Sequence, residues 1–281
     1  FPFVFQNEEG MIRVIRDDTL KVFEIDDSVS KSVVDSQTNQ VYYIRDRILD
    51  SDNIKENTRM ELLQDVGDFI LTKDRKVVYY TDAKGNLKYY NGTASGMLSE
   101  KCNTMPENYY VCGDNRLLFL EDYQPGEGTA RLCMARADGE VKRYDLCING
   151  EKPFAFNRSG TRICFYQGTD FCVMNEQGKI LARFEGGTAV AETVQASLVS
   201  ATTQYVTYTQ HISDRYIVES GETEGQSRLV YFDGSRTHEI AGDIEQILYY
   251  SEERDMILYT CTKQDGSMTV YRSVEGGKAE A

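Results

Sequence analysis

Short runs of apolar residues alternate with turn-forming residues along most of the chain. The clearest example is Val66–Lys101, where four such runs are separated by the segments KDR, DAKGN and NGTASG. Gly, Asn and Asp tolerate the backbone conformations of tight hairpin turns, whereas Val, Thr and Tyr favour strands. This stretch therefore predicts four short strands, at Phe69–Thr72, Val77–Thr81, Leu87–Tyr90 and Met97–Glu100.

The second strand of this unit recurs along the chain. Equivalent positions in successive copies lie 36 to 51 residues apart. A period of ~40–50 residues is typical of propeller blades with four strands each. The copies are Val41–Ile44, Val77–Thr81, Leu117–Leu120, Ile163–Tyr166, Tyr205–Thr209 and Met256–Thr260.

The third strand recurs as well, and Gly-containing turns such as Asn91–Gly92 and Asp138–Gly139 usually follow it. These turns predict tight hairpins from the third strand to the fourth. The copies are Leu20–Phe23, Leu87–Tyr90, Leu132–Ala135, Phe171–Met174, Leu229–Phe232 and Thr269–Tyr271.

The repeat predicts an all-β fold, a β-propeller of four-stranded antiparallel blades that forms a single domain over residues 1–281. Packing the blades face to face around an axis would bury both apolar faces of each sheet. We expect seven blades, with six and eight as alternatives. We also expect Phe1–Phe5 to close the ring by completing the last blade. The expected blades are residues 28–66, 67–103, 104–150, 151–187, 188–243 and 244–281, with a partial blade at 1–27.

The segment Val78–Asp82 reads VYYTD and resembles the YWTD signature of YWTD-type propellers, with Tyr in place of Trp. Leu258–Thr260 repeats part of this motif. The Tyr-rich units are similar to propeller domains of unknown function in Gram-positive bacterial surface proteins. The resemblance implies a propeller fold in a bacterial, extracytoplasmic protein, and it implies no catalytic residue.

The charge of the chain narrows the range of partners. With 31 Lys and Arg against 45 Asp and Glu, the formal net charge is −14. Nucleic acids and anionic membranes are bound through Lys and Arg, so we expect neither as a partner. No apolar run approaches the ~20 residues of a membrane-spanning helix, so we expect no direct membrane insertion of this segment. We also expect a monomer.

The cysteines and histidines do not indicate a metal site or a cofactor. The seven cysteines include no CxxC pair, and the chain has only two histidines. We expect reduced, structural cysteines, no metal and no cofactor. A disulfide between Cys164 and Cys172 is the best alternative. The acidic run Asp50–Asn53 does not fit a calcium-binding EF-hand, because Lys55 stands where Gly is needed.

The loops provide the candidate binding site. Arg45–Asn57, Glu121–Thr129 and Gln210–Gln226 read as long loops between second and third strands, which would place them on one rim of the propeller. Long loops on a rigid scaffold commonly carry binding residues, and Tyr and Arg commonly anchor interfaces. We therefore predict a loop rim that contacts a partner, with a mobile tip at Glu219–Gly225. The predicted contact residues are Tyr123, His211, Arg215 and Tyr216.

The functional expectation is a non-enzymatic binding module that recognises protein or glycan through this rim, in an extracytoplasmic or cell-surface setting. Two alternatives stay open. One is an enzyme with an acidic site at the central channel, and the other is an intracellular scaffold of the WD40 kind.

Overall fold

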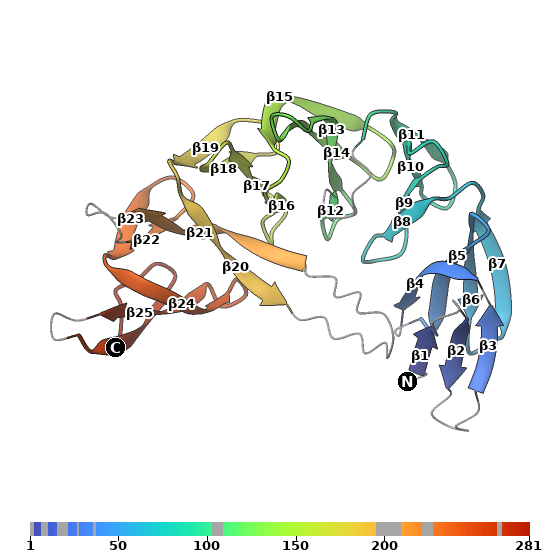
Figure 1. Ribbon diagram of the computed structural model, residues 1–281, viewed down its shortest axis with the longest axis horizontal. Coiled ribbons are helices and arrows are strands. Elements are labelled where there is room, and N and C mark those ends of the chain that lie inside the picture. Colours follow the sequence, from blue (N-terminus) through green and yellow to red (C-terminus); the bar gives the residue numbers. More distant parts are fainter. Residues whose placement is uncertain are drawn as a thin grey trace. The chain divides into compact units, whose positions relative to one another are not determined.

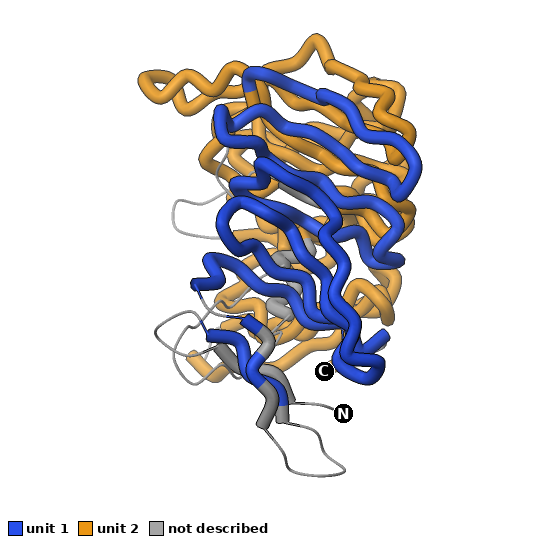
Figure 2. Tube along the Cα trace, turned by 90° about the vertical axis from the view of Figure 1, so that its right-hand side faces the viewer, with its two compact units in different colours: residues 1–101, 195–207 blue, residues 102–194, 208–281 orange. Residues whose placement is uncertain are grey.

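The computed structural model describes residues 3–6, 11–15, 22–26, 28–35, 38–102, 109–194, 209–220, 227–262 and 266–281 of the 281-residue chain. The contacts divide the chain into two compact units (Figure 2). Unit 1 comprises residues 1–101 and 195–207, and unit 2 comprises residues 102–194 and 208–281.

The described part of unit 1 contains three antiparallel sheets, in which neighbouring strands in the sequence are also neighbours in the sheet. The first sheet has three strands, β1 (Phe3–Gln6), β2 (Ile12–Ile15) and β3 (Val22–Asp26). The second has four, β4 (Val29–Asp35), β5 (Gln40–Arg45), β6 (Ile48–Asn53) and β7 (Thr58–Leu63). The third has four, β8 (Asp68–Leu71), β9 (Val78–Thr81), β10 (Leu87–Tyr90) and β11 (Ser95–Ser99).

The described part of unit 2 contains four more sheets of the same kind. The first is β12 (Tyr109–Val111), β13 (Leu117–Gln124), β14 (Thr129–Ala135) and β15 (Val141–Asn149). The second is β16 (Ala155–Phe156), β17 (Arg162–Gln167), β18 (Asp170–Asn175) and β19 (Ile180–Phe184). The third is β20 (Thr188–Val194), β21 (Thr209–Ser220), β22 (Ser227–Phe232) and β23 (Thr237–Ala241). The last is β24 (Ile244–Ser251), β25 (Met256–Thr262) and β26 (Met268–Val274).

Consecutive sheets of unit 2 pack face to face, and they follow one another in chain order in Figure 1. Leu118 and Leu132 of the β12–β15 sheet share one core with Ile163 and Phe165 of the β16–β19 sheet. Because side chains alternate between the faces of a strand, Leu117 and Phe119 point the other way, and they too are fully buried. Each such side chain stabilises the fold by about 1.5–3 kcal/mol.

The same packing is present in unit 1. Ile12 and Val14 of β2 contact Val41 and Tyr43 of β5 in one core, and the β4–β7 and β8–β11 sheets share another. Sheets that bury apolar residues on both faces cannot be stable alone, so stacking of repeats is the basis of this fold.

The all-β prediction is confirmed, with antiparallel strands in sheets of three or four. The bounds of the observed sheets agree with the segments that the repeat predicted. Of the predicted second strands, Tyr205–Thr209 lies outside the described residues except for Thr209. None of the described residues forms a helix, so no helix long and apolar enough to cross a membrane is found among them.

The pairing predicted for the N-terminal strand is wrong. The described part of the Phe1–Phe5 segment belongs to β1, which pairs with β2 in a hairpin, Phe3 opposite Ile15 and Phe5 opposite Arg13. A hairpin partner a few residues away costs little loop-closure entropy, whereas the last sheet lies at the other end of the sequence.

The long loops predicted between second and third strands are also wrong where they are described. Arg45–Asn57 contains the whole of β6. Of Glu121–Thr129, all but a four-residue turn belongs to β13 and β14. Gln210–Ser220 is part of β21, and residues 221–226, with most of the predicted mobile tip, lie outside the described residues.

Candidate functional site

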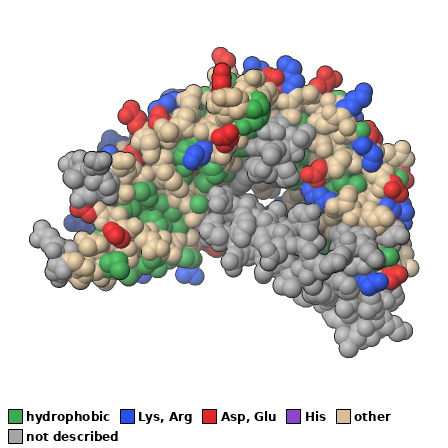
Figure 3. Space-filling model, in the orientation of Figure 1, with side chains coloured by type: hydrophobic (Ala, Val, Ile, Leu, Met, Phe, Trp, Pro, Cys, Tyr) green, Lys and Arg blue, Asp and Glu red, His purple; other side chains and the backbone are tan. Residues whose placement is uncertain are grey.

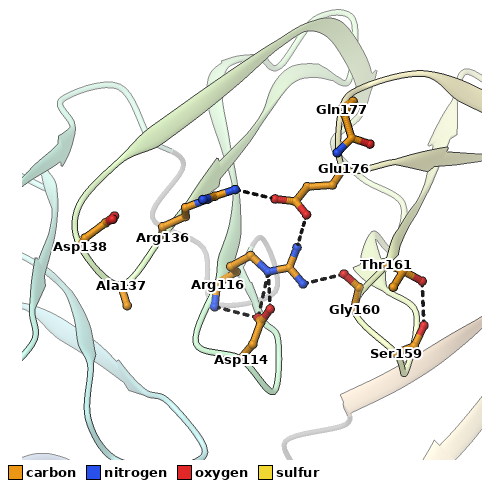
Figure 4. Close-up of a pocket in the computed structure, with 10 residues that line it drawn as sticks. All are labelled: Asp114, Arg116, Arg136, Ala137, Asp138, Ser159, Gly160, Thr161, Glu176 and Gln177. Atoms are coloured by element: carbon orange, nitrogen blue, oxygen red, sulfur yellow. Dashed lines mark hydrogen bonds and ion pairs between the residues drawn. The ribbon is translucent and has the colours of Figure 1, made fainter.

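An open cavity of about 750 Å³ lies within unit 2, where turns of the β12–β15 and β16–β19 sheets meet (Figure 4). Two of these turns join first to second strands, and the other two join third to fourth strands. We call this cavity the short-turn pocket. Its lining comes from the turns Cys112–Arg116, Arg136–Glu140, Asn157–Arg162 and Asn175–Lys179.

Each of these turns is closed by a backbone hydrogen bond between its end residues, of 2.8–3.0 Å. Each also contains one residue with positive φ, at 69° to 95°. Gly and Asn adopt this conformation most easily, and they occupy these positions. The pocket is therefore carried by tight hairpin turns and not by long loops. The positive-φ residues are Asn115, Gly139, Gly160 and Gly178.

Arg116 is the most constrained side chain of the pocket, with 11% of its side chain exposed. Its Nε donates to both oxygens of Asp114, at 2.9 and 2.7 Å. Nη1 pairs with Glu176 at 3.1 Å, and Nη2 donates to the carbonyl oxygen of Gly160 at 2.5 Å. The guanidinium also lies 4.5 Å from the centre of the Phe156 ring. Arg116 thus links its own turn to the next sheet and fixes the back wall of the pocket.

Glu176 lies between two arginines. One carboxylate oxygen pairs with Arg116, and the other accepts a hydrogen bond of 2.9 Å from Nη2 of Arg136. The backbone oxygen of Glu176 accepts hydrogen bonds from Lys142 and Tyr144, at 2.8 and 2.9 Å. Arg136 is half exposed. A smaller cavity of about 150 Å³ shares Arg136, Glu176 and Gln177 with the pocket.

The opposite side of the pocket carries hydroxyl groups. Ser159 and Thr161 are hydrogen-bonded to each other at 2.8 Å, and Ser159 also accepts a bond of 3.1 Å from the side-chain amide of Asn157. In Figure 4 both hydroxyl groups lie on the turn that also presents Gly160 to Arg116. The site therefore combines guanidinium, carboxylate, amide and hydroxyl groups around one cavity.

The ion pairs hold Asp114 and Arg116 in their charged forms. Burial alone would raise the pKa of Asp114, but the hydrogen bonds and charge of Arg116 outweigh it and lower the pKa. Burial alone would lower the pKa of Arg116, but its contacts with Asp114 and Glu176 raise it. Near neutral pH, Asp114 therefore acts as a fixed hydrogen-bond acceptor.

The structure does not bring the predicted contact residues together. Tyr123 lies on β13, where it packs at the edge of the core and donates a hydrogen bond of 3.0 Å to Glu151. Arg215 and Tyr216 lie on β21, in a sheet that does not neighbour the sheet of Tyr123. His211 pairs with Glu192 in the backbone register of β21, and its side chain lies outside the described residues.

Tyr216 is a core residue, so the prediction that it offers its ring to a partner is wrong. It is fully buried, and its hydroxyl donates to the backbone oxygen of Asp255 at 2.8 Å and accepts from the Gly276 amide at 3.2 Å. Arg215 pairs with the Asp255 carboxylate and donates to the Tyr231 hydroxyl at 3.1 Å. Both side chains link the β20–β23 sheet to the turns of the β24–β26 sheet.

The pocket residues were missed because the short turns were interpreted only as hairpin connections. One signal was present in the sequence. Two successive third-to-fourth turns, RADGE and NEQGK, carry a charged residue within one or two positions of the turn glycine. Their proximity depends on the packing of two sheets, which the turn sequences do not reveal.

The described residues contain no group of three or more His, Cys, Asp or Glu side chains placed to hold a metal. The acidic run on β6 forms ion pairs instead. Asp50 pairs with Arg45 at 3.4 Å, and Asp52 pairs with Arg59 at 3.4 Å and accepts a hydrogen bond of 2.8 Å from Tyr43.

All seven cysteines are free thiols. The alternative disulfide between Cys164 and Cys172 does not form. Phe165 is the residue opposite Cys172, so the two cysteines point to opposite faces of the sheet.

Comparison with known proteins gives the fold and not the function. No protein-family profile matches the chain, and no curated protein sequence matches it. Among solved structures, dipeptidyl peptidase 4 from Porphyromonas gingivalis is similar over 99% of this chain, with 12% identity and a TM-score of 0.53. The matched region covers 51% of the peptidase, so the chain spans about half of its length.

Two further structures are less similar. A functionally unknown protein from Desulfotomaculum acetoxidans matches over 100% of this chain and 94% of its own, with 12% identity and a TM-score of 0.42. Oligogalacturonate lyase from Vibrio parahaemolyticus matches over 100% of this chain and 83% of its own, with 9% identity and a TM-score of 0.43. The structural neighbours have propeller-like folds.

Proposed function

We propose that this chain is a non-enzymatic binding module that recognises a protein or glycan partner through the short-turn pocket. The observation that carries the proposal is the wall formed by Asp114, Arg116, Glu176 and Arg136, which is held by ion pairs of 2.7–3.1 Å beside an open cavity of about 750 Å³. Pockets of this size with a few preorganised polar groups are typical ligand sites. Preorganisation favours binding, because less side-chain entropy is lost when a partner docks.

The charge states of the wall favour binding over acid–base chemistry. A general acid or base works best with a pKa near the working pH. The pKa of Asp114 is lowered and that of Arg116 is raised, so both groups move away from neutrality. They supply fixed donors and acceptors, which is what recognition of a partner requires.

The proposal includes an extracytoplasmic location and a complete propeller with seven blades. The resemblance to Tyr-rich propeller domains of Gram-positive surface proteins supports the location. The blade count is supported by the seven sheets of the described residues. Closure of the ring is supported by the exposed apolar side chains of the last sheet, which a neighbouring blade would cover. They include Leu248, Tyr249, Met268 and Val270.

The binding proposal is tested by selecting ligands for the unmodified chain from a glycan array and a random-peptide library. The selected ligand is then measured against Arg136→Met, which removes the half-exposed guanidinium of the pocket. The matched variant is Tyr123→Leu, which tests the residue predicted from the sequence and leaves the pocket intact. Biolayer interferometry gives the affinities, and a thermal melt shows that both variants are folded.

We expect Arg136→Met to weaken binding by about tenfold or more, as loss of a hydrogen bond from a charged group does. Tyr123→Leu should bind like the unmodified chain. A ligand that is lost with Tyr123→Leu and kept with Arg136→Met would instead support the region predicted from the sequence. A chain that retains no ligand from either collection would contradict the proposal.

A further inference from the structure

The charged side chains of the short-turn pocket form an alternating row of carboxylates and guanidiniums. Asp114 pairs with Arg116 at 2.7 Å, Arg116 with Glu176 at 3.1 Å, and Glu176 with Arg136 at 2.9 Å. Asp138, at the edge of the pocket, accepts a hydrogen bond of 3.0 Å from the backbone amide of Glu140. Asp114, Arg116, Glu176 and Arg136 are therefore each paired with an opposite charge before any ligand arrives.

The row still has hydrogen-bonding capacity. A guanidinium carries five N–H donors, and Arg136 is half exposed while it pairs through its Nη atoms with Glu176 and, at 3.8 Å, with Glu140. Asp114 exposes 56% of its side chain, and a carboxylate accepts about four hydrogen bonds. Across the cavity, the Ser159–Thr161 pair uses one hydroxyl proton for its own hydrogen bond, which leaves the other for a ligand.

A charged ligand fits this arrangement poorly. An anion on Arg136 would compete with Glu176, and a cation on Asp114 would compete with Arg116. The Arg116 side chain is only 11% exposed, so displacing one of its partners leaves a largely buried charge uncompensated, which is unfavourable. A neutral ligand can add hydrogen bonds to the outer sides of these groups and leave every pair in place.

An apolar ligand fits no better. Among the described residues that line the pocket, Ala137 carries the single apolar side chain, and the Arg116 guanidinium lies 4.5 Å from the centre of the Phe156 ring. On the face drawn in Figure 3, acidic and basic side chains of the described residues are interspersed. A hydroxyl group both donates and accepts, which matches a wall where donors and acceptors alternate.

We propose that the short-turn pocket binds a neutral, hydroxyl-rich ligand, namely a segment of an uncharged oligosaccharide. The inference rests on the proposed binding function and names the class of its ligand. A protein partner is the competing outcome, because protein surfaces recognise such turns through their own charged side chains, with affinities that depend on salt.

The experiment uses an array of neutral and charged glycans, followed by calorimetry on matched pairs. Hexa-N-acetylchitohexaose and its fully deacetylated form share one backbone and differ in charge, and a hyaluronan hexasaccharide supplies an anionic counterpart. Malto-, cello- and xylohexaose extend the neutral set. Each glycan that the array retains is measured in about 50 mM and about 500 mM NaCl, which changes the Debye length about threefold.

We expect at least one neutral glycan to bind, with an affinity that changes less than about twofold between the two salt concentrations. Arg136→Met should weaken this binding by about tenfold to a hundredfold. The matched control is Arg158→Met. Arg158 is 54% exposed and lies on the Asn157–Arg162 turn, but it does not line the pocket. This control should bind with unchanged affinity.

The failures of the two proposals are distinguishable. A charged glycan or a peptide whose binding falls with salt and is weakened by Arg136→Met would overturn the neutral-glycan inference and support the binding function. An array on which no neutral glycan is retained also overturns the inference. Ligands that bind both arginine variants like the unmodified chain would overturn both proposals.

Discussion

Single arginines connect neighbouring sheets of unit 2. Arg116 reaches Gly160 and Glu176 of the next sheet, and Arg162 pairs at 2.8 Å with Asp214 of the sheet after that. Asp214 is 3% exposed, and its carboxylate is paired with Arg162 and accepts a hydrogen bond of 3.1 Å from Asn157. Apolar packing has no preferred direction, whereas an ion pair requires a defined orientation of its two side chains. Removing one partner leaves a buried charge uncompensated.

Asp82 organises the hairpin between β9 and β10 and gives stability a pH dependence. One carboxylate oxygen accepts from the amides of Lys84 and Asn86, at 2.9 and 3.0 Å, and the other pairs with Lys88 at 2.9 Å. Burial alone would raise the pKa of Asp82, but these hydrogen bonds outweigh it and lower the pKa far below its ordinary value. In the unfolded chain an Asp side chain has a pKa of about 3.9. As the pH falls, the unfolded state therefore binds a proton at this position before the folded state does, and this lowers the stability of the fold.

We predict that Asp82→Asn lowers the free energy of unfolding by about 1–2 kcal/mol at neutral pH. The stabilisation from the depressed pKa is fully present above about pH 4 and is lost as pH falls toward the folded pKa. The difference in unfolding free energy between the unmodified chain and the variant should therefore narrow from about pH 4 down to the lowest pH at which the chain stays folded. Urea unfolding at several pH values measures it.

The control for this experiment is Asp145→Asn, at an exposed position on β15. Its effect on stability should be small and should not follow the same pH dependence. If Asp82→Asn lowers the free energy of unfolding by the same amount at neutral and at acid pH, the negative charge of the carboxylate does not contribute to stability.

At the scale of elements, the described turns between first and second strands share one backbone feature. Each contains a residue with φ between 45° and 70°. The residue types differ from turn to turn, so this common feature is not visible as a sequence motif. The residues are Asn39, Arg75, Asn115, Gly160 and Asp255.

We predict that Gly160→Ala destabilises unit 2 by about 1–3 kcal/mol. At its φ of 69°, a Cβ atom would lie 2.8 Å from both the Arg116 Nη2 and the Cys112 Sγ atoms. The substitution would therefore strain the backbone and move Arg116 away from its carbonyl partner. Urea unfolding followed by circular dichroism measures the loss.

The matched control is Asn115→Gly, in the equivalent turn with a φ of 70°. Glycine adopts this conformation without strain and adds no atom, so stability should change by about half a kcal/mol or less. If both substitutions change the free energy of unfolding by the same small amount, neither the φ angle nor the contact with Arg116 matters at position 160.

At the scale of the whole molecule, the last sheet differs from the others described in unit 2. Tyr271 of β26 packs against the core shared with β20–β23, whereas Val270 and Met268, which point the other way, are 50% and 69% exposed. A sheet with one bare apolar face is the expected end of an open stack, and ring closure is the usual way to cover it.

If the propeller is closed as we propose, Val270→Asp should lower the free energy of unfolding by about 2 kcal/mol or more, because it would bury an unpaired carboxylate. Met60→Asp, at a 63% exposed position of β7, is the matched control and should cost well under half as much. Thermal and urea unfolding compare the two. Equal, small losses would contradict closure over the β24–β26 face.

Much of the fold could be predicted because its signals are local. The strands around Tyr79, Phe119 and Phe165 were predicted from short apolar runs, and the turns after third strands from Asn-Gly or Asp-Gly pairs. The run Leu117–Leu120 is buried on both faces, which is why it reads as continuously apolar. Period and turn chemistry are properties of a few consecutive residues, so the sequence determined the all-β class, the repeat and the limits of the sheets.

Tertiary structure decided where polar residues form strands and where a site arises. Asp50 is 2% exposed on β6, a strand that reads as a polar loop, and its carboxylate pairs at 3.4 Å with Arg45 of the neighbouring strand β5. Asp214 is 3% exposed on β21, and its partners are Arg162 at 2.8 Å and Asn157 at 3.1 Å, both from the neighbouring β16–β19 sheet and its turns. A polar residue is stable inside a sheet when its partner arrives from another strand, and that partner is set by packing.

The short-turn pocket follows the same rule. Arg116 and Glu176 are 60 positions apart in the sequence, and each belongs to an ordinary hairpin turn of its own repeat. They meet because the apolar faces of two successive sheets pack together and bring their turns to one edge. The sequence determined the repeats and their turns from local periodicity, whereas the charged wall of the pocket depended on which repeats became neighbours, since ion pairs between distant residues form only after the apolar faces have packed.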